Sequence, residues 1–205
     1  MPTTSDRTLI VDLLRHGEPE GGQRYRGHLD DPLSATGWAQ MRAAVAGDTW
    51  DRILTSPLTR CRAFAETLGG ELDIPVAVEP AFREISFGRW EGLTAAEILE
   101  QDGDHLGRFW ADGDAHPPPE GERLGAFHQR VGDGWHRRCR ELMGNHVLVV
   151  GHGGLIRMIL AHVLNVPPNR TMAGVAIPYA CRSRVRLDDT DHGLLGCLQS
   201  HGPRP

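Results

Sequence analysis

The chain has 205 residues, of which 40% are hydrophobic and 24% are charged; this composition is typical of a globular protein and excludes a disordered or fibrous chain. Its 22 Lys and Arg residues and 27 Asp and Glu residues give a net charge of −5, which argues against a general nucleic-acid binder and a polybasic membrane-surface protein. An anionic substrate would therefore need a local cationic pocket.

The first part of the chain alternates predicted strands and helices. Residues 8–14 form a β-branched, apolar run that is typical of a buried strand. Ser34 or Thr36 can cap a helix that extends to about residue 46. The further predictions are a strand over 51–55, a helix that begins at Ser56 and Pro57 and ends at Gly69 and Gly70, and a strand over 75–79.

Residues 80–121 depart from this pattern because they are rich in glycine, acidic and aromatic residues. We interpret this segment as an insertion that covers another part of the molecule, with Thr94 and Glu97 as the capping box of a short helix. The remaining predictions are a helix over 122–143, a strand over 146–150, a helix over 154–164 and two strands within 174–199.

The alternation of strands and helices predicts an α/β fold: a doubly wound, mostly parallel sheet with helices on both faces. We expect residues 1–205 to form a single domain that includes the 80–121 insertion. Ligands of such sheets bind beyond the carboxyl ends of the strands. Three loops follow predicted strand ends here, and we expect them to converge on one crevice. They contain Arg15, His16 and Gly17; residues 56–60, which end in Arg60; and Gly151, His152, Gly153 and Gly154.

These loops contain the residue types that bind a phosphate dianion. Arg15 and Arg60 can donate forked, charge-assisted hydrogen bonds to phosphate oxygens, and the predicted helix starts near Pro57 and Gly153 add backbone N–H groups. A neutral histidine whose second ring nitrogen is held by a carbonyl or carboxylate can act as a nucleophile toward phosphorus. Each loop alone is a weak signal, since an isolated His152 between glycines is more often a tight-turn residue. The prediction of function rests on the three loops together.

Other features argue against a metal site and against export. The four cysteines have no short paired spacing, and the histidines show no ligand spacing such as HxxxH. We therefore expect no metal ion and four reduced thiols. The N-terminal segment lacks the apolar stretch of a signal peptide, and no apolar run reaches the roughly 18 residues of a membrane span. These features predict a cytoplasmic protein.

Five ordered motifs resemble those of a known family. They are LLRHGE near the N-terminus, GxxDxPLSxxG over 27–37, TSPLxRC over 55–61, REISFGRWEG over 83–92 and VVGHGG over 149–154. Between about residues 8 and 165, the chain resembles the phosphoglycerate-mutase-like branch of the histidine phosphatase superfamily. Residues 15–34 are most similar to the α-ribazole-5′-phosphate phosphatases of cobalamin biosynthesis.

The resemblance implies a phosphomonoesterase that works through a phosphohistidine without a cofactor, with α-ribazole 5′-phosphate as its substrate. The implied catalytic residues are His16, Glu84, Arg15, Arg60 and His152. By the resemblance, His16 becomes phosphorylated, and the two arginines and His152 bind the phosphoryl group beside Gly153. Glu84 protonates the leaving alcohol and then activates water. The residues alone leave Glu91 and Glu18 as equal candidates for this acid.

The sequence departs from the pattern RHGxTxxN of many relatives, because Pro19 and Gly22 occupy the Thr and Asn positions. Arg26 is a candidate replacement for the missing substrate contact, and a solvent-exposed Arg26 is the alternative. The departure affects the expected substrate contacts and leaves the phosphohistidine chemistry in place.

Two other functions remain open. One is a broad-specificity phosphatase or a mutase-like enzyme. The other is a catalytically idle protein that only binds phosphorylated ligands. The presence of all five catalytic residues argues against this second alternative. We expect a small phosphate ester as the partner, no nucleic acid and no membrane, and a homodimer is compatible with the sequence. Three aromatic residues of the insertion either stack on a flat base of the substrate or pin the insertion to the core. They are Trp90, Phe109 and Trp110.

Overall fold

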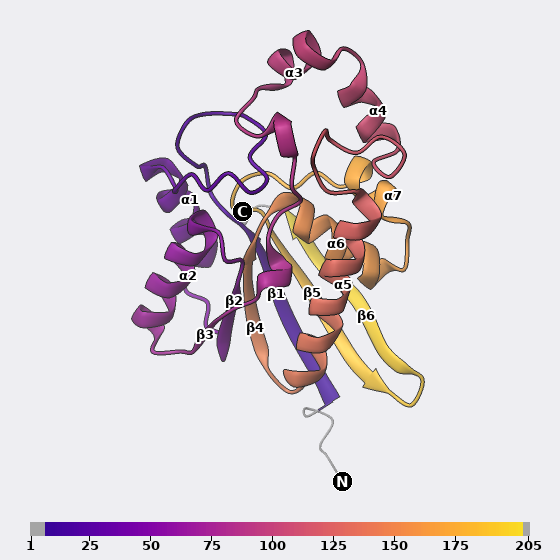
Figure 1. Ribbon diagram of the computed structural model, residues 1–205. Helices are drawn as coiled ribbons and strands as arrows, with labels where there is room; N and C mark the ends of the chain where they lie inside the picture. The colour runs from indigo at the N-terminus through magenta and orange to yellow at the C-terminus, as the bar shows by residue number, and fades with distance from the viewer. Residues whose placement is uncertain (1–6, 203–205) are drawn as a thin grey trace.

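The computed structural model describes residues 7–202 and shows an α/β fold (Figure 1). One sheet has the strand order β3-β2-β4-β1-β5-β6. The strands are β1 (Thr8–Arg15), β2 (Arg52–Thr55), β3 (Val76–Val78), β4 (His146–Gly151), β5 (Arg182–Thr190) and β6 (Gly193–Gly202). Strands β1 to β4 are parallel, whereas β5 and β6 are antiparallel to their neighbours. The predicted doubly wound, mostly parallel sheet is confirmed.

Helices cover both faces of this sheet (Figure 1). One face carries α1 (Ala35–Val45) and α2 (Thr59–Leu72), and the other carries α5 (Leu124–Glu141) and α6 (Gly153–Leu164). The remaining elements are α3 (Ala95–Asp102), α4 (His105–Ala111), α7 (Pro168–Gly174) and the 3₁₀ turns η2 (Pro80–Phe82) and η3 (Gly88–Trp90). Among residues 7–202, no helix has the length and apolar character that a membrane span requires.

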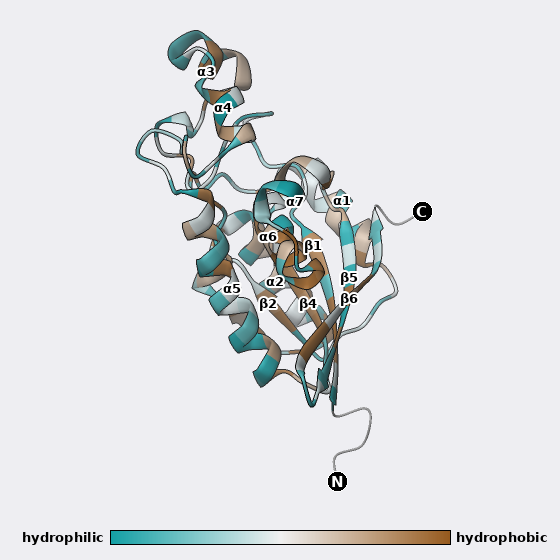
Figure 2. Cartoon of the chain, turned by 90° about the vertical axis from the view of Figure 1, so that its right-hand side faces the viewer, coloured by the Kyte–Doolittle hydropathy of each residue, from teal (hydrophilic) through white to brown (hydrophobic). Residues whose placement is uncertain are grey.

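Alternate side chains of the central strands build two apolar cores, one on each face of the sheet. In β4, Val147 and Val149 join the core beneath α5 and α6, whereas Leu148 and Val150 join the core beneath α1 and α2. Because both faces are covered, the central strands are almost continuously apolar in sequence. Figure 2 shows this distribution as hydrophobic strands inside and a largely hydrophilic outer surface on α5.

The predicted boundaries of α2 are wrong at both ends. The helix begins at Thr59, and Gly69 and Gly70 lie within it. It ends at Leu72, where Asp73 adopts a left-handed conformation with φ of 54°. A glycine is required inside the helix because a Cβ on Gly69 would lie 2.2 Å from a methyl carbon of Val76 in β3. Close packing against β3, and not helix termination, accounts for this glycine.

The part of segment 80–121 that contains α3 and α4 lies beyond the carboxyl ends of the parallel strands (Figures 1 and 2), whereas Phe82 of η2 packs into the core beneath α5. The predicted capping box of the segment is present, since the Thr94 hydroxyl accepts from the Glu97 N–H and the Glu97 carboxylate accepts from the Thr94 N–H. Trp90 and Phe109 are buried in the core that α5 and α6 share. These two aromatic residues therefore pin the segment to the rest of the chain. Its membership of a single domain over 1–205 stays a prediction.

Candidate active site

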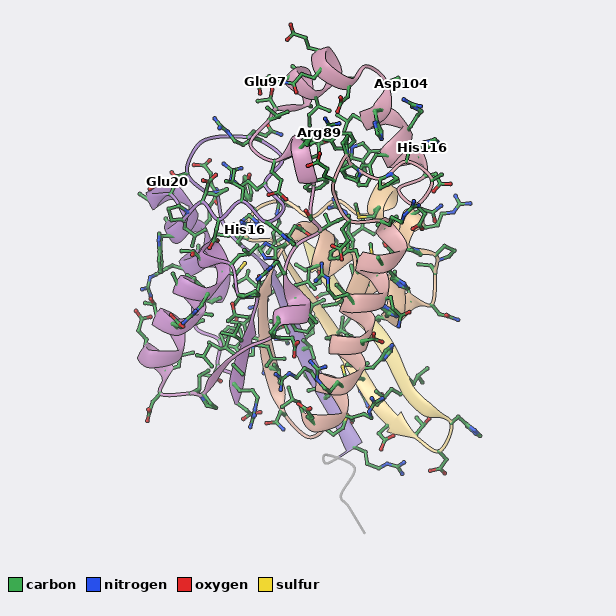
Figure 3. The ribbon with its side chains drawn as sticks, in the orientation of Figure 1. His16, Glu20, Arg89, Glu97, Asp104 and His116 are labelled. Atoms are coloured by element: carbon green, nitrogen blue, oxygen red, sulfur yellow. The ribbon has the colours of Figure 1, made fainter. Side chains whose placement is uncertain are left out.

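The three predicted loops meet at the carboxyl ends of β1, β2 and β4. Arg15, His16, Arg60, Glu84 and Gly153 all line one cavity of about 1000 Å³. Figure 3 shows His16 near the upper ends of the strands, with the labelled side chains of the 80–121 segment above it. The predicted convergence of the loops is confirmed.

His16 follows β1 directly and is 6% exposed. Its Nδ1 lies 2.7 Å from the carbonyl oxygen of Gly17. Because a carbonyl can only accept a hydrogen bond, Nδ1 carries the ring proton and Nε2 keeps its lone pair. Burial, followed by the charges of Arg60 and Arg15, holds the pKa of His16 well below its usual range. The ring is therefore neutral at pH 7, as a nucleophilic imidazole must be.

The loop that carries His16 is held tightly against α1. A Cβ on Gly17 would lie 2.2 Å from the carbonyl oxygen of Gly37, and a Cβ on Gly37 would lie 2.0 Å from that of Glu18. Only glycine permits this approach, which explains the glycine of RHG and the last glycine of GxxDxPLSxxG. The Ser34 hydroxyl caps α1 at the same place by accepting from the Gly37 N–H at 3.0 Å. This packing fixes the backbone next to His16.

Two arginines flank His16, and each has an unused buried donor. Arg15 donates from Nη1 to the carbonyl oxygen of Ile177 at 2.5 Å. Arg60 donates to the carbonyl oxygens of Leu29 and Gly27 at 2.7 and 2.8 Å. The Nε atoms of both arginines are buried without a hydrogen-bond partner in the described part of the chain. Buried cationic donors that lack a partner favour the binding of an anion.

His152 lies deeper than His16 and is fully buried. The two rings meet edge to face, with centroids 5.3 Å apart. His152 Nε2 lies 2.7 Å from the Ser56 hydroxyl and 3.6 Å from the Cys61 sulfur. Burial lowers the pKa of His152, helped by the charge of Arg60, and burial raises the pKa of the Cys61 thiol. Both groups are neutral, and contact of His152 with a phosphoryl group stays a prediction.

Glu84 reaches the cavity from the 80–121 segment, and its carboxylate lies at the start of α6. It accepts hydrogen bonds from the N–H groups of Gly154, Leu155 and Ile85 at 2.9, 3.2 and 3.0 Å. A Cβ on Gly154 would lie 2.3 Å from Glu84 Oε1, which explains the second glycine after His152. The prediction that N–H groups at this helix start point at a phosphate is wrong for Gly154 and Leu155, because the Glu84 carboxylate accepts from both. For Gly153 it stays a prediction.

The two other candidate acids have different environments. Glu91 Oε1 accepts from the backbone N–H groups of His28 and Phe87 at 2.9 and 3.0 Å, and so links two loops that are far apart in sequence. Glu18 lines the cavity, and its carboxylate accepts from the Ser34 hydroxyl at 3.0 Å. Glu84 and Glu18 therefore both line the cavity, whereas the Glu91 carboxylate holds the backbone at His28 and Phe87.

Arg26 lines the cavity but is held by its own loop. It is 6% exposed, so the alternative of a solvent-exposed Arg26 is wrong. Its Nη2 donates to the carbonyl oxygens of Glu20 and Gly22 at 2.5 and 2.6 Å, and its Nε pairs with Asp31 at 2.9 Å. These contacts fold the segment 20–31, and a role for Arg26 in substrate binding stays a prediction.

Two further cavity residues lie outside the predicted site. The Tyr179 ring lies beneath the guanidinium of Arg15, 4.3 Å from its central carbon, and 5.8 Å from the His16 ring. Arg157 follows Gly153 by one helical turn in α6, and its Nη1 is 3.3 Å from where a Cβ on Gly153 would lie. The i,i+4 spacing could reveal Arg157. No sequence pattern predicts Tyr179 as a site residue. It precedes β5 in the sequence, and the pairing of β5 with β1 places it beside His16.

The wall of the cavity away from His16 is aromatic. Tyr25, Phe87 and Trp110 line it. Trp110 Nε1 donates to the Tyr25 hydroxyl at 3.2 Å, and the rings of Tyr25 and Phe87 meet edge to face with centroids 5.0 Å apart. Trp90 and Phe109, at 1% and 2% exposed, belong to the core and not to the cavity lining. Of the three aromatic residues considered for stacking, Trp110 is thus the one that lines the cavity.

No group of three or more His, Cys, Asp and Glu side chains in the described ranges is arranged to hold a metal ion. The four cysteines are free thiols. Positive charge beside His16 is supplied by Arg15 and Arg60.

Comparison with known proteins matches residues 11–197 to the histidine phosphatase superfamily (branch 1). The chain belongs to this superfamily. It is 29% identical over 182 residues to an adenosylcobalamin/α-ribazole phosphatase of Escherichia coli, across 86% of this chain and 89% of that protein. It is also 29% identical over 193 residues to a 2,3-bisphosphoglycerate-dependent phosphoglycerate mutase of Rhizobium etli, across 88% and 90% of the two chains. The solved α-ribazole phosphatase of Shigella flexneri has a TM-score of 0.80 and 25% identity, across 94% of this chain and 96% of its own. This histidine phosphatase is therefore a phosphatase enzyme with the family's α/β fold.

Proposed function

We propose that this histidine phosphatase hydrolyses α-ribazole 5′-phosphate to α-ribazole through a phosphohistidine at His16. The observation that carries the proposal is the neutral His16 ring, whose Nδ1 is held by the Gly17 carbonyl, beside the unpartnered donors of Arg15 and Arg60. This arrangement combines a nucleophile with cationic groups for the transferring phosphoryl group.

In the first step, His16 Nε2 attacks phosphorus, and the bond from phosphorus to the ester oxygen breaks as the P–N bond forms. Arg15 and Arg60 stabilise the charge on the phosphoryl oxygens. Glu84 gives its proton to the leaving oxygen, so the product leaves as a neutral alcohol. In the second step, water attacks phosphorus, Glu84 takes its proton, and the P–N bond breaks to release inorganic phosphate and neutral His16.

The outer part of the cavity supports a substrate with a large, flat group. A volume of about 1000 Å³ far exceeds what a phosphate ion fills. Tyr25, Phe87 and Trp110 provide aromatic faces that suit the benzimidazole base of α-ribazole phosphate. The names of the relatives from E. coli and S. flexneri support the same substrate, and the mutase from R. etli is the reason to test phosphoglycerate as well.

Steady-state kinetics on three esters test this proposal. We expect kcat/KM for α-ribazole 5′-phosphate to exceed that for glycerol phosphate by on the order of 10²-fold, because the aromatic wall binds only the former. Equal values would remove the ribazole proposal and leave a broad-specificity phosphatase. Interconversion of phosphoglycerates with added 2,3-bisphosphoglycerate would indicate a mutase instead. Binding of phosphate esters without turnover of any of them would indicate the idle alternative.

Excess EDTA is expected to leave the activity unchanged, whereas vanadate is expected to inhibit it. Arginines and histidines supply the cationic and nucleophilic groups of the proposed mechanism, and vanadate mimics the five-coordinate transition state. Hydrolysis of para-nitrophenyl phosphate measures both effects. Loss of activity in EDTA that a divalent ion restores would contradict the mechanism.

Replacement of Trp110 by Ala is expected to raise KM for α-ribazole 5′-phosphate about tenfold, because stacking on a base is worth ~1–3 kcal/mol. KM for glycerol phosphate should stay unchanged. Trp38→Ala is the matched control, since Trp38 is also half-buried but lies on α1, packs against Phe64 of α2 and does not line the cavity. An equal rise of KM for both esters in Trp110→Ala would show that Trp110 stabilises the position of α4 and does not select the substrate.

A further inference from the structure

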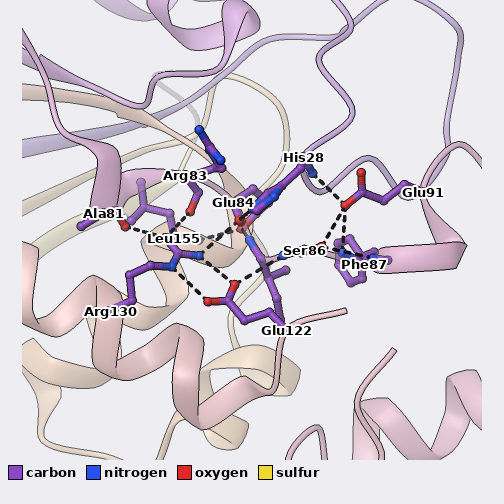
Figure 4. Close-up of polar contacts among 12 residues, drawn as sticks. His28, Ala81, Arg83, Glu84, Ser86, Phe87, Glu91, Glu122, Arg130 and Leu155 are labelled. Atoms are coloured by element: carbon purple, nitrogen blue, oxygen red, sulfur yellow. Dashed lines mark hydrogen bonds and ion pairs between the residues drawn. The ribbon is translucent and has the colours of Figure 1, made fainter. Parts of the chain in front are cut away.

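The segment that carries Glu84 depends on side chains to satisfy its backbone. Residues 83–87 connect η2 and η3 and belong to no helix or strand, so their carbonyl groups need other partners. Arg130 of α5 supplies two of them, at Arg83 and Glu84, and also binds the carbonyl group of Ala81 in η2. Its Nη1 donates to the carbonyl oxygens of Ala81 and Arg83 at 2.8 and 3.0 Å, and its Nη2 lies 3.4 Å from that of Glu84 (Figure 4).

Arg130 is in turn fixed by Glu122. The two side chains form a bidentate ion pair with distances of 3.0 and 2.8 Å. The side chains are 29% and 19% exposed, so water screens the pair less than it would on an open surface. Glu122 also donates from its backbone N–H to the Ser86 carbonyl oxygen at 2.9 Å. The ion pair therefore bridges α5 to both ends of the segment that contains Glu84.

The peptide of Glu84 is held from a second side as well. Its carbonyl oxygen accepts from His28 Nε2 at 3.0 Å, and its carboxylate accepts from the start of α6. Arg130 itself is absent from the cavity lining among the described residues. Any effect of Arg130 on the reaction is therefore indirect, and its hydrogen bonds to the backbone of Arg83 and Glu84 connect it to the acid.

We propose that Arg130, in its ion pair with Glu122, is a positioning residue for the Glu84 acid. This inference rests on the proposed function, in which Glu84 protonates the leaving oxygen. Proton transfer requires the carboxyl oxygen to lie within hydrogen-bond reach of the ester oxygen. By binding the carbonyl groups of Ala81, Arg83 and Glu84, Arg130 keeps the Glu84 carboxyl group within reach of the leaving oxygen. Loss of this support mainly impairs proton donation.

Replacement of Arg130 by Met tests the proposal, because Met fills similar space without a donor or charge. We expect kcat for glycerol phosphate, a poor leaving group, to fall about 10²-fold. We expect kcat for para-nitrophenyl phosphate to change less than about threefold, because that leaving group needs no proton. Arg130→Lys, which keeps the charge and one donor group, should restore part of the loss with glycerol phosphate.

Arg137→Met is the matched control on the same helix. Arg137 pairs with Glu79, next to η2, at 2.6 Å, and it is half exposed. This variant should leave the ratio of the two kcat values unchanged. In a Glu84→Gln background, Arg130→Met should not change that ratio further, because the acid is already absent.

An equal loss with both esters, or a full additional loss in the Glu84→Gln background, would overturn the positioning role. If Arg130→Met fails to fold, Glu122→Gln gives the same readout, since it removes the charge of the partner and keeps an oxygen acceptor. The failure of the proposed function has a different signature: Glu84→Gln alone would then show no selective loss with glycerol phosphate. A selective loss in Glu84→Gln without one in Arg130→Met would overturn only the positioning role.

Discussion

Replacement of His16 by Ala is expected to abolish turnover of every phosphate ester, with a loss in kcat on the order of 10⁶-fold. The reason is that the P–N bond of the intermediate cannot form, and Nε2 of His16 is the neutral, lone-pair-bearing nitrogen beside Arg15 and Arg60. Rapid quench of the wild-type enzyme with ³²P-labelled substrate should yield protein-bound phosphate that is stable in base and released by acid.

His192→Ala is the control for this experiment, because His192 is exposed in the turn between β5 and β6. It should retain both turnover and the acid-labile label. Labelling of the His16→Ala protein at the wild-type level would place the nucleophile on another residue. Full activity of that variant would contradict the phosphohistidine mechanism.

Replacement of Glu84 by Gln is expected to lower kcat for alkyl phosphates about 10²–10⁴-fold, while para-nitrophenyl phosphate is affected far less. Glutamine keeps the shape of the side chain but has no proton to give to an alkoxide leaving group. Glu91→Gln is the control, since the Glu91 carboxylate accepts from backbone N–H groups that a glutamine oxygen can also serve. If both variants lose alkyl-ester hydrolysis equally, the assignment of Glu84 as the acid fails.

The architecture could be predicted because hydrophobic periodicity is a local property. In residues 8–14 and 146–150, most consecutive side chains are apolar, and these side chains point to opposite faces of the sheet. Both faces must therefore be covered by helices. The direction of β5 and β6 could not be predicted, since it depends on a long-range pairing with β1. The end of α2 could not be predicted either, because Gly69 is selected by contact with β3 and not by local turn chemistry.

The site was predictable where the residues follow strand ends. Arg15, His16 and Arg60 lie in loops whose convergence follows from the parallel sheet. The partners of the helix N–H groups were not predictable, because they come from distant loops. The N–H of Thr59 at the start of α2, for example, donates to Asp30 at 2.7 Å. Such contacts depend on loop conformations that carry no periodic signal in sequence.

The central position of β1 in the sheet has a consequence for biosynthesis. The strand pairs with β4 on one side and β5 on the other, and Arg15 is held by the carbonyl of Ile177. Contacts between residues so far apart in sequence form slowly. On the ribosome they cannot form until the hairpin of β5 and β6 has been synthesised. A nascent chain that lacks β5 therefore has an exposed, apolar β1 edge and an incomplete phosphate site. Catalytic competence therefore arises only after Ile177 and β5 have been synthesised and β5 has paired with β1.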